Sequence, residues 1–351
     1  MTRLVALYLP QFHPVPENDA WWEPGFTEWT NVAKAKPLFW GHKQPNLPAD
    51  LGFYDLRVPE VRQVQADMAR AHGIEAFCYW HYWFGDGKRL LERPISEVLA
   101  SGQPDFPFCL AWANQSWTGI WHGEPHRVLA EQTYPGPEDD ARHFYAVLPA
   151  LRDKRYFRVD GKALFLVYAP REVPDLPRFT DQWRELAHKE GVGELHLMGV
   201  FSYSRPVELR GLDSATFNPP LGRTLDAPLG RWLKRFPHRR RPRMARYTDF
   251  VATMGFERAW PATHYPTVLS NWDNTPRSGM NGYVLRGSTP ERFAAHLRDA
   301  CRIVQDRDPQ HRIVFIKSWN EWAEGNHLEP NRDWGMAYLE AVRAVVGGSE
   351  V

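Results

Sequence analysis

Residues 313–325 read Ile-Val-Phe-Ile-Lys-Ser-Trp-Asn-Glu-Trp-Ala-Glu-Gly, and this stretch carries the main evidence for both the fold and the chemistry. Its first half is an apolar, β-branched run, which is typical of a strand buried on both faces. Its second half places Glu321 and Glu324 three residues apart among Trp and Asn side chains. A carboxyl pair beside flat rings indicates a site that holds a sugar and breaks a glycosidic bond, since one acid protonates the leaving oxygen while the other acts as base or nucleophile. Alternatively, the two glutamates cap the following helix or form surface ion pairs.

Short apolar runs of this kind recur along the chain and alternate with helical patterns. The runs lie at 4–9, 74–80, 106–112, 163–168, 194–200, 213–217, 264–269 and 312–318, and the helical patterns at 59–72, 138–151, 180–190, 290–306 and 333–346. Eight strands with intervening helices predict an α/β fold, a (β/α)8 TIM barrel. A doubly wound sheet would place a Gly-rich turn after the first strand, where the sequence has Tyr-Leu-Pro-Gln-Phe-His-Pro. We expect one barrel domain over residues 1–351, with long loops at its C-terminal face formed by insertions at about 11–58 and 218–263.

Composition narrows the class of partner. A chain of 351 residues is long enough for one such barrel, and its net charge of +1 argues against a general polyanion binder. Its 16 Trp exceed what the core needs, and sugar rings stack on aromatic faces, so we expect an oligo- or polysaccharide partner. Three cysteines are too few for a disulfide framework. Without a signal peptide or an apolar run of membrane-spanning length, we expect a cytoplasmic protein with no integral membrane segment.

Polar and aromatic side chains collect where the predicted strands end. In a barrel of this class the active site is built from the C-terminal ends of the strands, so these side chains are expected to converge. The residues that we expect to contact the substrate are Tyr8, Gln11, His13, Tyr79, His81, Tyr82, Trp83, Trp112, Asn114, Tyr168, Tyr203, Asn218, Trp272, Asp273, Trp319, Asn320 and Trp322.

Some of these residues also fit a structural role. His81, between Tyr and Trp, is equally consistent with a hydrogen-bonded core histidine. Tyr79, Tyr82 and Trp83 could pack in the core, and Asp273 in Asn-Trp-Asp-Asn-Thr could form an Asx-turn.

No metal or cofactor is expected. His122 and His126 lack a helix and nearby acidic partners, which a metal site would need.

Glu28, in Thr-Glu-Trp-Thr, fits a structural role better than a catalytic one. The segment from Arg231 to Arg246 contains eight Lys or Arg and is either a solvated loop face or a contact for phosphate, acidic polysaccharide or a membrane surface. Nothing else in the chain favours nucleic acid.

Several motifs resemble those of a known family. Asn320-Glu-Trp-Ala-Glu-Gly325, followed by Leu328-Glu-Pro330, resembles the signature of family 99 glycoside hydrolases, the endo-α-mannosidase family. The segments at 6–14 and 272–275 are similar to other recurring segments of that family. Over nearly the whole chain, the likeness is to family 99-like bacterial proteins found with O-antigen genes and often labelled glycosyltransferases. Their hallmarks are matched at 25–32, 47–56 and 79–84.

The resemblance implies a (β/α)8 barrel that needs no metal and cleaves an α-linked mannose-type sugar with retention of configuration. It implies that Glu321 assists the 2-hydroxyl of the sugar in attacking the anomeric carbon, and that Glu324 acts as acid and then as base. Ala323 stands where the endo-α-mannosidases usually carry His, so we expect the sugar or its contacts to differ.

Three functions remain open. The first is a glycoside hydrolase acting on an α-linked mannose-type or rhamnose-type residue in a bacterial polysaccharide. The second is a glycosyltransferase in O-antigen assembly, for which the basic segment could receive a phosphate-bearing donor, although the chain has no Asp-x-Asp motif or Gly-rich phosphate loop. The third is a carbohydrate-binding protein with an inactive site, against which the intact glutamate pair argues.

Overall fold

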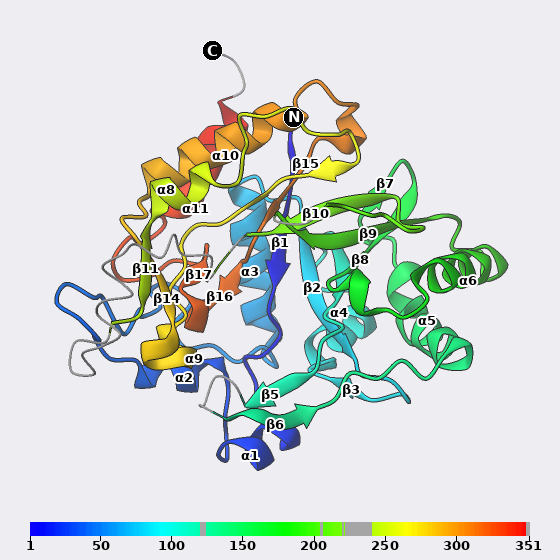
Figure 1. Ribbon diagram of the computed structural model, residues 1–351, viewed down its shortest axis with the longest axis horizontal. Coiled ribbons are helices and arrows are strands. Elements are labelled where there is room, and N and C mark those ends of the chain that lie inside the picture. The colour runs from blue at the N-terminus through cyan, green and yellow to red at the C-terminus, as the bar shows by residue number, and fades with distance from the viewer. Residues whose placement is uncertain (120–123, 204–205, 220, 222–240, 349–351) are drawn as a thin grey trace.

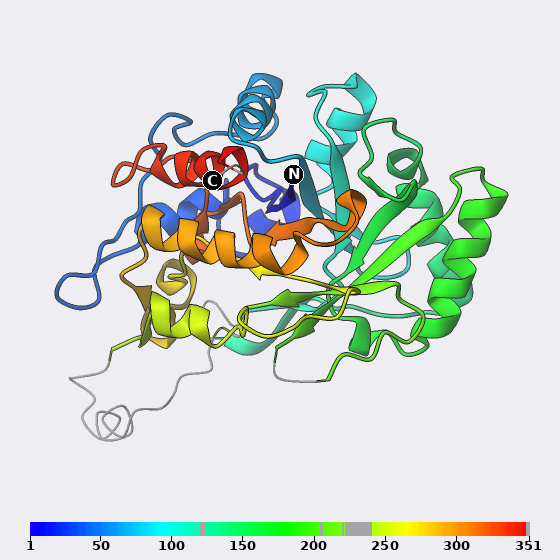
Figure 2. The same ribbon diagram turned by 90° about the horizontal axis from the view of Figure 1, so that it is seen from above.

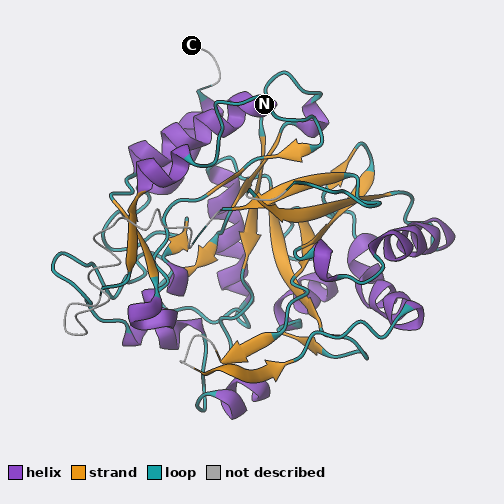
Figure 3. Ribbon diagram, in the orientation of Figure 1, coloured by secondary structure: helices purple, strands orange, loops and turns teal. Residues whose placement is uncertain are grey.

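The computed structural model describes residues 1–119, 124–203, 206–219, 221 and 241–348. Within these ranges a parallel sheet closes on itself in the middle of the molecule, and helices lie around it (Figures 1 and 3). The strands of the barrel are β1 (Arg3–Tyr8), β2 (Ala76–Trp83), β4 (Phe108–Trp112), β8 (Lys162–Val167), β9 (Leu195–Ser202), β10 (Ser214–Asn218), β12 (His264–Tyr265), β13 (Thr267–Val268) and β15 (Ile313–Ile316). The predicted (β/α)8 barrel is confirmed.

The seventh strand of the barrel is divided in two by Pro266. β12 pairs with β10 and β13 pairs with β15, so the two halves together close the sheet. Proline has no N–H to donate to a ladder, which interrupts the pairing at that point. Its carbonyl still accepts a hydrogen bond of 2.9 Å from the Phe315 N–H.

Helices cover the outside of the barrel. They are α3 (Pro59–Ala71), α4 (Arg93–Ser101), α5 (Pro137–Leu151), α6 (Leu176–Lys189), α10 (Pro290–Val304) and α11 (Ala337–Gly347). α10 and α11 lie side by side, as Figure 2 shows. The strands beneath them are almost fully buried, and all eight residues of β2 are. Continuous apolar runs therefore identified these strands, because parallel strands are covered on both faces.

The helices predicted at 59–72, 138–151 and 290–306 match α3, α5 and α10 to within two residues at each end. The other helix predictions were less exact. α6 begins at Leu176 instead of residue 180, because the Asp175 carboxylate caps it by accepting from the Arg178 N–H at 3.2 Å. α11 begins at Ala337 instead of residue 333, and α4 was not predicted. Between β9 and β10, the described residues 203 and 206–213 form no helix, so the alternation of strand and helix is incomplete there.

The inserted segments lie over the C-terminal end of the barrel. α1 (Pro16–Trp21), α2 (Glu28–Lys34), β5 (Trp117–Gly119) and β6 (Glu124–Ala130) lie at the end towards which the β1 arrow points (Figure 1). Beside them, a small second apolar core joins α8 (Tyr247–Ala252) to β14 (Tyr283–Arg286), which pairs with β11 (Arg243–Arg246). The remaining short elements are β3 (Arg89–Leu90), β7 (Arg158–Val159), α9 (Thr275–Ser278), β16 (Asn320–Glu321) and β17 (Asn326–His327).

Among the described residues, no helix is both long and apolar enough to cross a membrane. The cytoplasmic location and the single-domain organisation stay predictions. Most of the basic segment, residues 231–240, lies outside the described residues, while 241–246 enter β11.

Candidate active site

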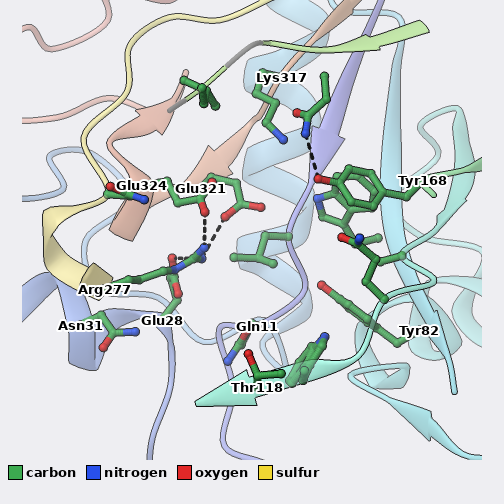
Figure 4. Close-up of a pocket in the computed structure, with 18 of the residues that line it drawn as sticks. Gln11, Glu28, Asn31, Tyr82, Thr118, Tyr168, Arg277, Lys317, Glu321 and Glu324 are labelled. Atoms are coloured by element: carbon green, nitrogen blue, oxygen red, sulfur yellow. Dashed lines mark hydrogen bonds and ion pairs between the residues drawn. The ribbon is translucent and has the colours of Figure 1, made fainter. Parts of the chain in front are cut away.

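A pocket of about 450 Å³ opens at the C-terminal end of the barrel. Side chains from the strand ends and from the inserted segments meet in it (Figure 4). It is lined by Leu9, Gln11, Trp22, Phe26, Glu28, Asn31, Trp80, Tyr82, Ala113, Gln115, Ser116, Trp117, Thr118, Leu129, Tyr168, Asn218, Leu221, Arg243, Trp272, Asn274, Arg277, Tyr283, Lys317, Glu321 and Glu324. Of the predicted site residues, the structure therefore brings seven to one pocket: Gln11, Tyr82, Tyr168, Asn218, Trp272, Glu321 and Glu324.

The centre of the pocket wall is a carboxylate cluster organised by one arginine. Arg277 donates from Nη2 to Glu321 at 2.9 Å and from Nη1 to Glu324 at 2.7 Å (Figure 4). Two carboxylate oxygens bound to one rigid guanidinium lie no more than about 8 Å apart, which is within the separations that glycosidase carboxyl pairs use. The two side chains keep 9% and 14% of their surface exposed, so they lie at the wall of the pocket and not beneath its floor.

Glu28 completes the cluster from the opposite side. Its Oε1 accepts from Arg277 Nη2 at 2.5 Å and from the Ala323 backbone N–H at 3.0 Å, and its side chain is only 1% exposed. Glu28 thus holds Arg277 and the backbone between the two pocket glutamates at once. The structural role expected for Glu28 fits this position, although its carboxyl belongs to the site.

Burial and mutual repulsion keep a proton in this cluster. Burial, opposed by Arg277 and reinforced by the charge of Glu321, raises the pKa of Glu324 to about 7. Burial likewise raises the pKa of Glu28, against the attraction of Arg277. Burial alone would lower the pKa of Arg277, but Glu28, Glu324 and Glu321 outweigh it and raise that pKa. One guanidinium cannot neutralise three close carboxylates, so Glu324 is half-protonated near neutral pH.

The turn that presents Glu324 depends on a glycine. Gly325 has a φ of +58° and ends the short turn 322–324, and a Cβ there would lie 3.0 Å from the Asp273 backbone N. Asp273 N–H also donates to the Glu324 carbonyl at 2.6 Å. Only a residue without a side chain allows the two backbone segments to approach this closely.

Lys317 enters the pocket from the end of β15, opposite Arg277 (Figure 4). Only 7% of the residue is exposed, and its Nζ lies 5.9 Å from the centre of the Trp80 ring. It makes no ion pair within the part of the chain that the structure describes. Nearby, Asn218 donates to the Tyr168 hydroxyl at 2.9 Å, which fixes a polar edge beside the ammonium.

The alternation of side chains between the two faces of a strand, here called strand parity, decides which residues at the strand ends reach the pocket. In β2, Trp80 and Tyr82 line the pocket, whereas Tyr79, His81 and Trp83 point to the other face of the sheet. Successive side chains of a strand alternate between faces, so neighbours in sequence separate in space.

The outward residues of β2 form a sealed cluster with α5. His81 and His143 share a hydrogen bond of 2.9 Å between their Nε2 atoms, and the Trp83 indole donates to Asp139 at 2.9 Å. The Trp112 indole donates to the Trp83 carbonyl at 2.9 Å. Burial lowers the pKa of His81 to about 3, which keeps this histidine neutral. The structure therefore does not bring His81, Trp83 or Trp112 to the pocket.

Other predicted residues brace the site from behind. The Asn320 side chain accepts from the Leu9 N–H at 2.7 Å and donates to the Leu9 carbonyl at 3.0 Å. The Trp322 indole donates to Glu329 at 2.6 Å. Asp273 accepts from the Thr275 N–H at 3.1 Å, which is the Asx-turn considered from the sequence. None of these three lines the pocket.

The last group is packed elsewhere in the fold. The Tyr8 hydroxyl donates to Gln65 at 2.6 Å, and the Tyr8 ring lies 4.5 Å from the Tyr79 ring, centre to centre. The Asn114 side chain spans Tyr134 and Ala169. Buried His13, Trp319 against Phe77, and Tyr203 against Phe217 also lie off the pocket.

Sequence analysis missed the residues that control the pocket electrostatics. Arg277 and Lys317 were not selected, and neither were the aromatic residues Trp22, Phe26, Trp80 and Trp117. A signal for Arg277 was present, because it follows the Trp-Asp-Asn-Thr motif at 272–275 by two residues. Lys317 directly follows β15 and its side chain points into the pocket, and only the structure shows to which face of the strand it points.

Among the described residues, no group of three or more His, Cys, Asp or Glu side chains is arranged to hold a metal ion. His122 lies outside the described residues, as does the side chain of His126. The absence of a cofactor stays a prediction.

Comparison with known proteins places the chain in a family. The family model described as "Glycosyltransferase WbsX" matches residues 4–342. The chain belongs to the WbsX family. A curated relative from Xanthomonas campestris pv. campestris, named "Uncharacterized protein WxcX", is 42% identical over 345 residues and 97% of this chain. The chain spans about half the length of that relative, 49% of it.

The fold is that of family 99 structures. The GH99 endo-alpha-mannosidase from Bacteroides thetaiotaomicron, solved with bis-tris propane, superposes with a TM-score of 0.58 at 15% identity, covering 99% of this chain and 96% of that one. A structure titled "Glycoside hydrolase-like protein" gives 0.60 at 13% identity, with 98% and 93% covered. The WbsX chain therefore has a family 99-like barrel, as its motifs predicted.

Proposed function

We propose that this WbsX protein is a glycoside hydrolase that cleaves an α-linked mannose-type or rhamnose-type residue in a bacterial polysaccharide, with retention of configuration. One observation carries the proposal. Glu321 and Glu324 are held on one guanidinium at the wall of an aromatic pocket, and the pKa of Glu324 is raised to about 7. A proton donor and a neighbouring base are the two groups that glycoside cleavage requires.

In the proposed first step, the 2-hydroxyl of the sugar acts as the nucleophile. Glu321 accepts the proton of the 2-hydroxyl while the 2-oxygen of the sugar bonds to the anomeric carbon. The bond from the anomeric carbon to the leaving oxygen breaks, and Glu324 donates its proton to that oxygen. This substrate-assisted route differs from the usual pair of an acid and a carboxylate nucleophile.

In the second step, water opens the strained ring formed by the 2-oxygen. Glu324, now ionised, accepts a proton from water as the water oxygen bonds to the anomeric carbon. The bond to the 2-oxygen breaks, and that oxygen regains its proton from Glu321. Two inversions at the anomeric carbon give net retention, and both glutamates return to their starting states.

Arg277 supports this division of roles by positioning both acids. It fixes one oxygen of each carboxylate and leaves the other oxygen of each for the substrate. Trp22, Trp117 and Trp272 line the same pocket and offer apolar ring faces to adjacent sugars.

A glycosyltransferase remains the second candidate, because the family description names that activity. The pocket argues against a nucleotide donor: a diphosphate placed at the wall would face three carboxylates. Saturable binding of GDP-mannose or another nucleotide sugar would favour this candidate over hydrolysis.

The test is a survey of mannose- and rhamnose-containing bacterial polysaccharides, with released oligosaccharides detected by mass spectrometry. Glu321→Gln and Glu324→Gln should each lower the rate by several orders of magnitude, while the exposed Glu257→Gln serves as the matched control. On an aryl glycoside, whose leaving group needs no proton, Glu324→Gln should lose far less activity in the first step than Glu321→Gln. A substrate lacking the 2-hydroxyl should not be cleaved. Near-normal turnover by Glu324→Gln on a natural polysaccharide would refute the assignment.

A further inference from the structure

A second pocket, of about 650 Å³, is lined in part by residues of β14, β17 and α11. Figure 1 shows these elements on one side of the molecule. It shares no lining residue with the pocket that holds the glutamates. The side chains that matter for its chemistry are Phe39, Asn271, Arg286, Arg332, Trp334 and Tyr338.

The two pockets lie back to back across a thin wall. Trp272 and Tyr283 line the first pocket, and the next residues along the chain, Asp273 and Val284, line the second. Extended segments expose alternate side chains on opposite sides, so one layer of chain forms both surfaces. A ligand in the second pocket would thus sit directly behind the carboxylate cluster without touching it.

Aromatic rings stand on two sides of the second pocket. Phe39 stacks on His42 with ring centres 4.3 Å apart, and Trp334 meets the Tyr338 ring edge-on at 6.1 Å. Trp40, whose neighbours Phe39 and Gly41 line the pocket, is 97% exposed. It lies in a turn closed by a 3.1 Å hydrogen bond from the His42 N–H to the Phe39 carbonyl. A flat ring left in water beside a pocket is typical of stacking against a sugar.

The loop that carries these rings is fixed to the body of the protein. His42 and the Gln44 side chain each donate to Asp273 at 2.8 Å, and the Asn46 side chain bonds His327 at 2.7 Å. The rim is therefore ordered before a ligand arrives, which lowers the entropic cost of binding.

The polar groups of the second pocket indicate the charge of its ligand. Lys43 is paired with Asp333 at 2.8 Å, whereas Arg286 and Arg332 make no ion pair with any described residue. Guanidinium groups bind carboxylates in a fixed, two-pronged geometry. The buried Oδ1 of Asn271 has no hydrogen-bond partner among the described residues, so it is available to accept from a ligand hydroxyl.

We propose that this second pocket binds a saccharide that carries a carboxylate, such as a hexuronate unit of an acidic polysaccharide. Its ring stacks at the aromatic rim, its carboxylate lies between Arg286 and Arg332, and one of its hydroxyls donates to Asn271. The site holds glycan without cleaving it, since the lining contributes no pair of free acids.

The experiment is calorimetric titration of the full protein with trigalacturonate and with a mannuronate trisaccharide, and with maltotriose as the neutral probe. Saturable binding of at least one uronate, and none of maltotriose, is expected. The double variant Arg286→Ala/Arg332→Ala should weaken that binding by about tenfold or more, while Arg298→Ala, an exposed arginine on α10, should leave it unchanged. Trp40→Ala should weaken it by a smaller factor.

Titration of the Glu324→Gln variant separates this site from the glutamate pocket, because uronate binding to the second pocket should be unaffected. Absence of saturable uronate binding, or binding that the double arginine variant leaves intact, would overturn the proposal. Binding of UDP or GDP that depends on the same two arginines, without uronate binding, would also overturn it in favour of a nucleotide site.

Discussion

The sealed cluster of His81, Trp83, Asp139 and His143 and the pocket cluster of Glu28, Arg277, Glu321 and Glu324 are built from similar materials. Both lie near strand ends, both link titratable side chains by hydrogen bonds, and both are mostly buried. They differ in the face of the barrel to which they point. The sealed cluster faces α5, where His81 pairs with His143 and the Trp83 indole donates to Asp139. The pocket cluster faces a cavity and sets three carboxylates around one guanidinium. Residue type alone therefore does not identify a site, and the face of the strand must be known.

The largest expected effect comes from removing the organiser of the pocket cluster. Arg277→Met leaves three close carboxylates without their common partner, so both proposed catalytic groups lose their position. We expect kcat/KM to fall by about a hundredfold to a thousandfold and the unfolding free energy by about 3 kcal/mol. Steady-state kinetics and urea unfolding measure the two effects.

The matched control is Arg302→Met, which removes the exposed pair with Asp299 on α10 and should cost less than about 1 kcal/mol. If Arg277→Met does not fold, Arg277→Lys keeps the charge but cannot hold both glutamates in the same geometry. Unchanged kcat/KM in a folded Arg277 variant would contradict the role of Arg277 in positioning Glu321 and Glu324.

The next effect is a dependence of activity on pH that only the pocket cluster can produce. Glu324 must be protonated to act as acid, and its pKa is raised to about 7 by burial. The protonated fraction falls as pH rises through that value, so kcat/KM should drop about tenfold per unit above pH 7. A profile on a natural substrate that stays flat to pH 9 would contradict the role given to Glu324.

Two tyrosines of β2 test the parity of the strand on a smaller scale. Tyr82 faces the pocket and Tyr79 faces the packed side. Tyr82→Leu should raise KM by roughly tenfold through lost ring contact with the sugar, whereas Tyr79→Leu should lower stability and leave KM unchanged. Equal effects of the two substitutions on KM would mean that parity does not separate the clusters.

A finer effect is expected at Lys317, whose positive charge lowers the pKa of Glu324 against the effect of burial. Lys317→Met should move the falling limb of the pH profile to higher pH. The exposed Lys189→Met on α6 should not move it. An unchanged falling limb, or a shift to lower pH, would contradict the effect of the Lys317 charge on Glu324.

The smallest effect on activity is expected in the sealed cluster. His81→Leu leaves the His143 ring without its partner and should cost about 1 to 3 kcal/mol of stability, with kcat/KM within about twofold of the wild type. Thermal unfolding and kinetics on the same sample give both values. A large loss of activity in a fully folded His81→Leu variant would argue that the sealed cluster reaches the substrate.

The sequence was sufficient for the barrel and for its two central acids. Continuous apolar runs located the strands because parallel strands are buried on both faces, and Glu321 and Glu324 were marked by their spacing together with their Trp and Asn neighbours. The motifs at 320–325 and 79–84 were enough to identify the family 99-like fold. The same continuous apolar runs did not show which face of the strand each side chain points to. A strand such as β2, buried on both faces, has no polar and apolar alternation from which to choose Trp80 over His81.

Tertiary structure alone decided which charges meet. Arg277 lies 44 residues from Glu321 and 249 from Glu28, and only closure of the barrel brings the three together. The raised pKa of Glu324 follows from that meeting and from burial, neither of which is local to its motif. Residue identity and order were thus properties of the chain, whereas the raised pKa of Glu324 and the two back-to-back pockets are properties of the packing.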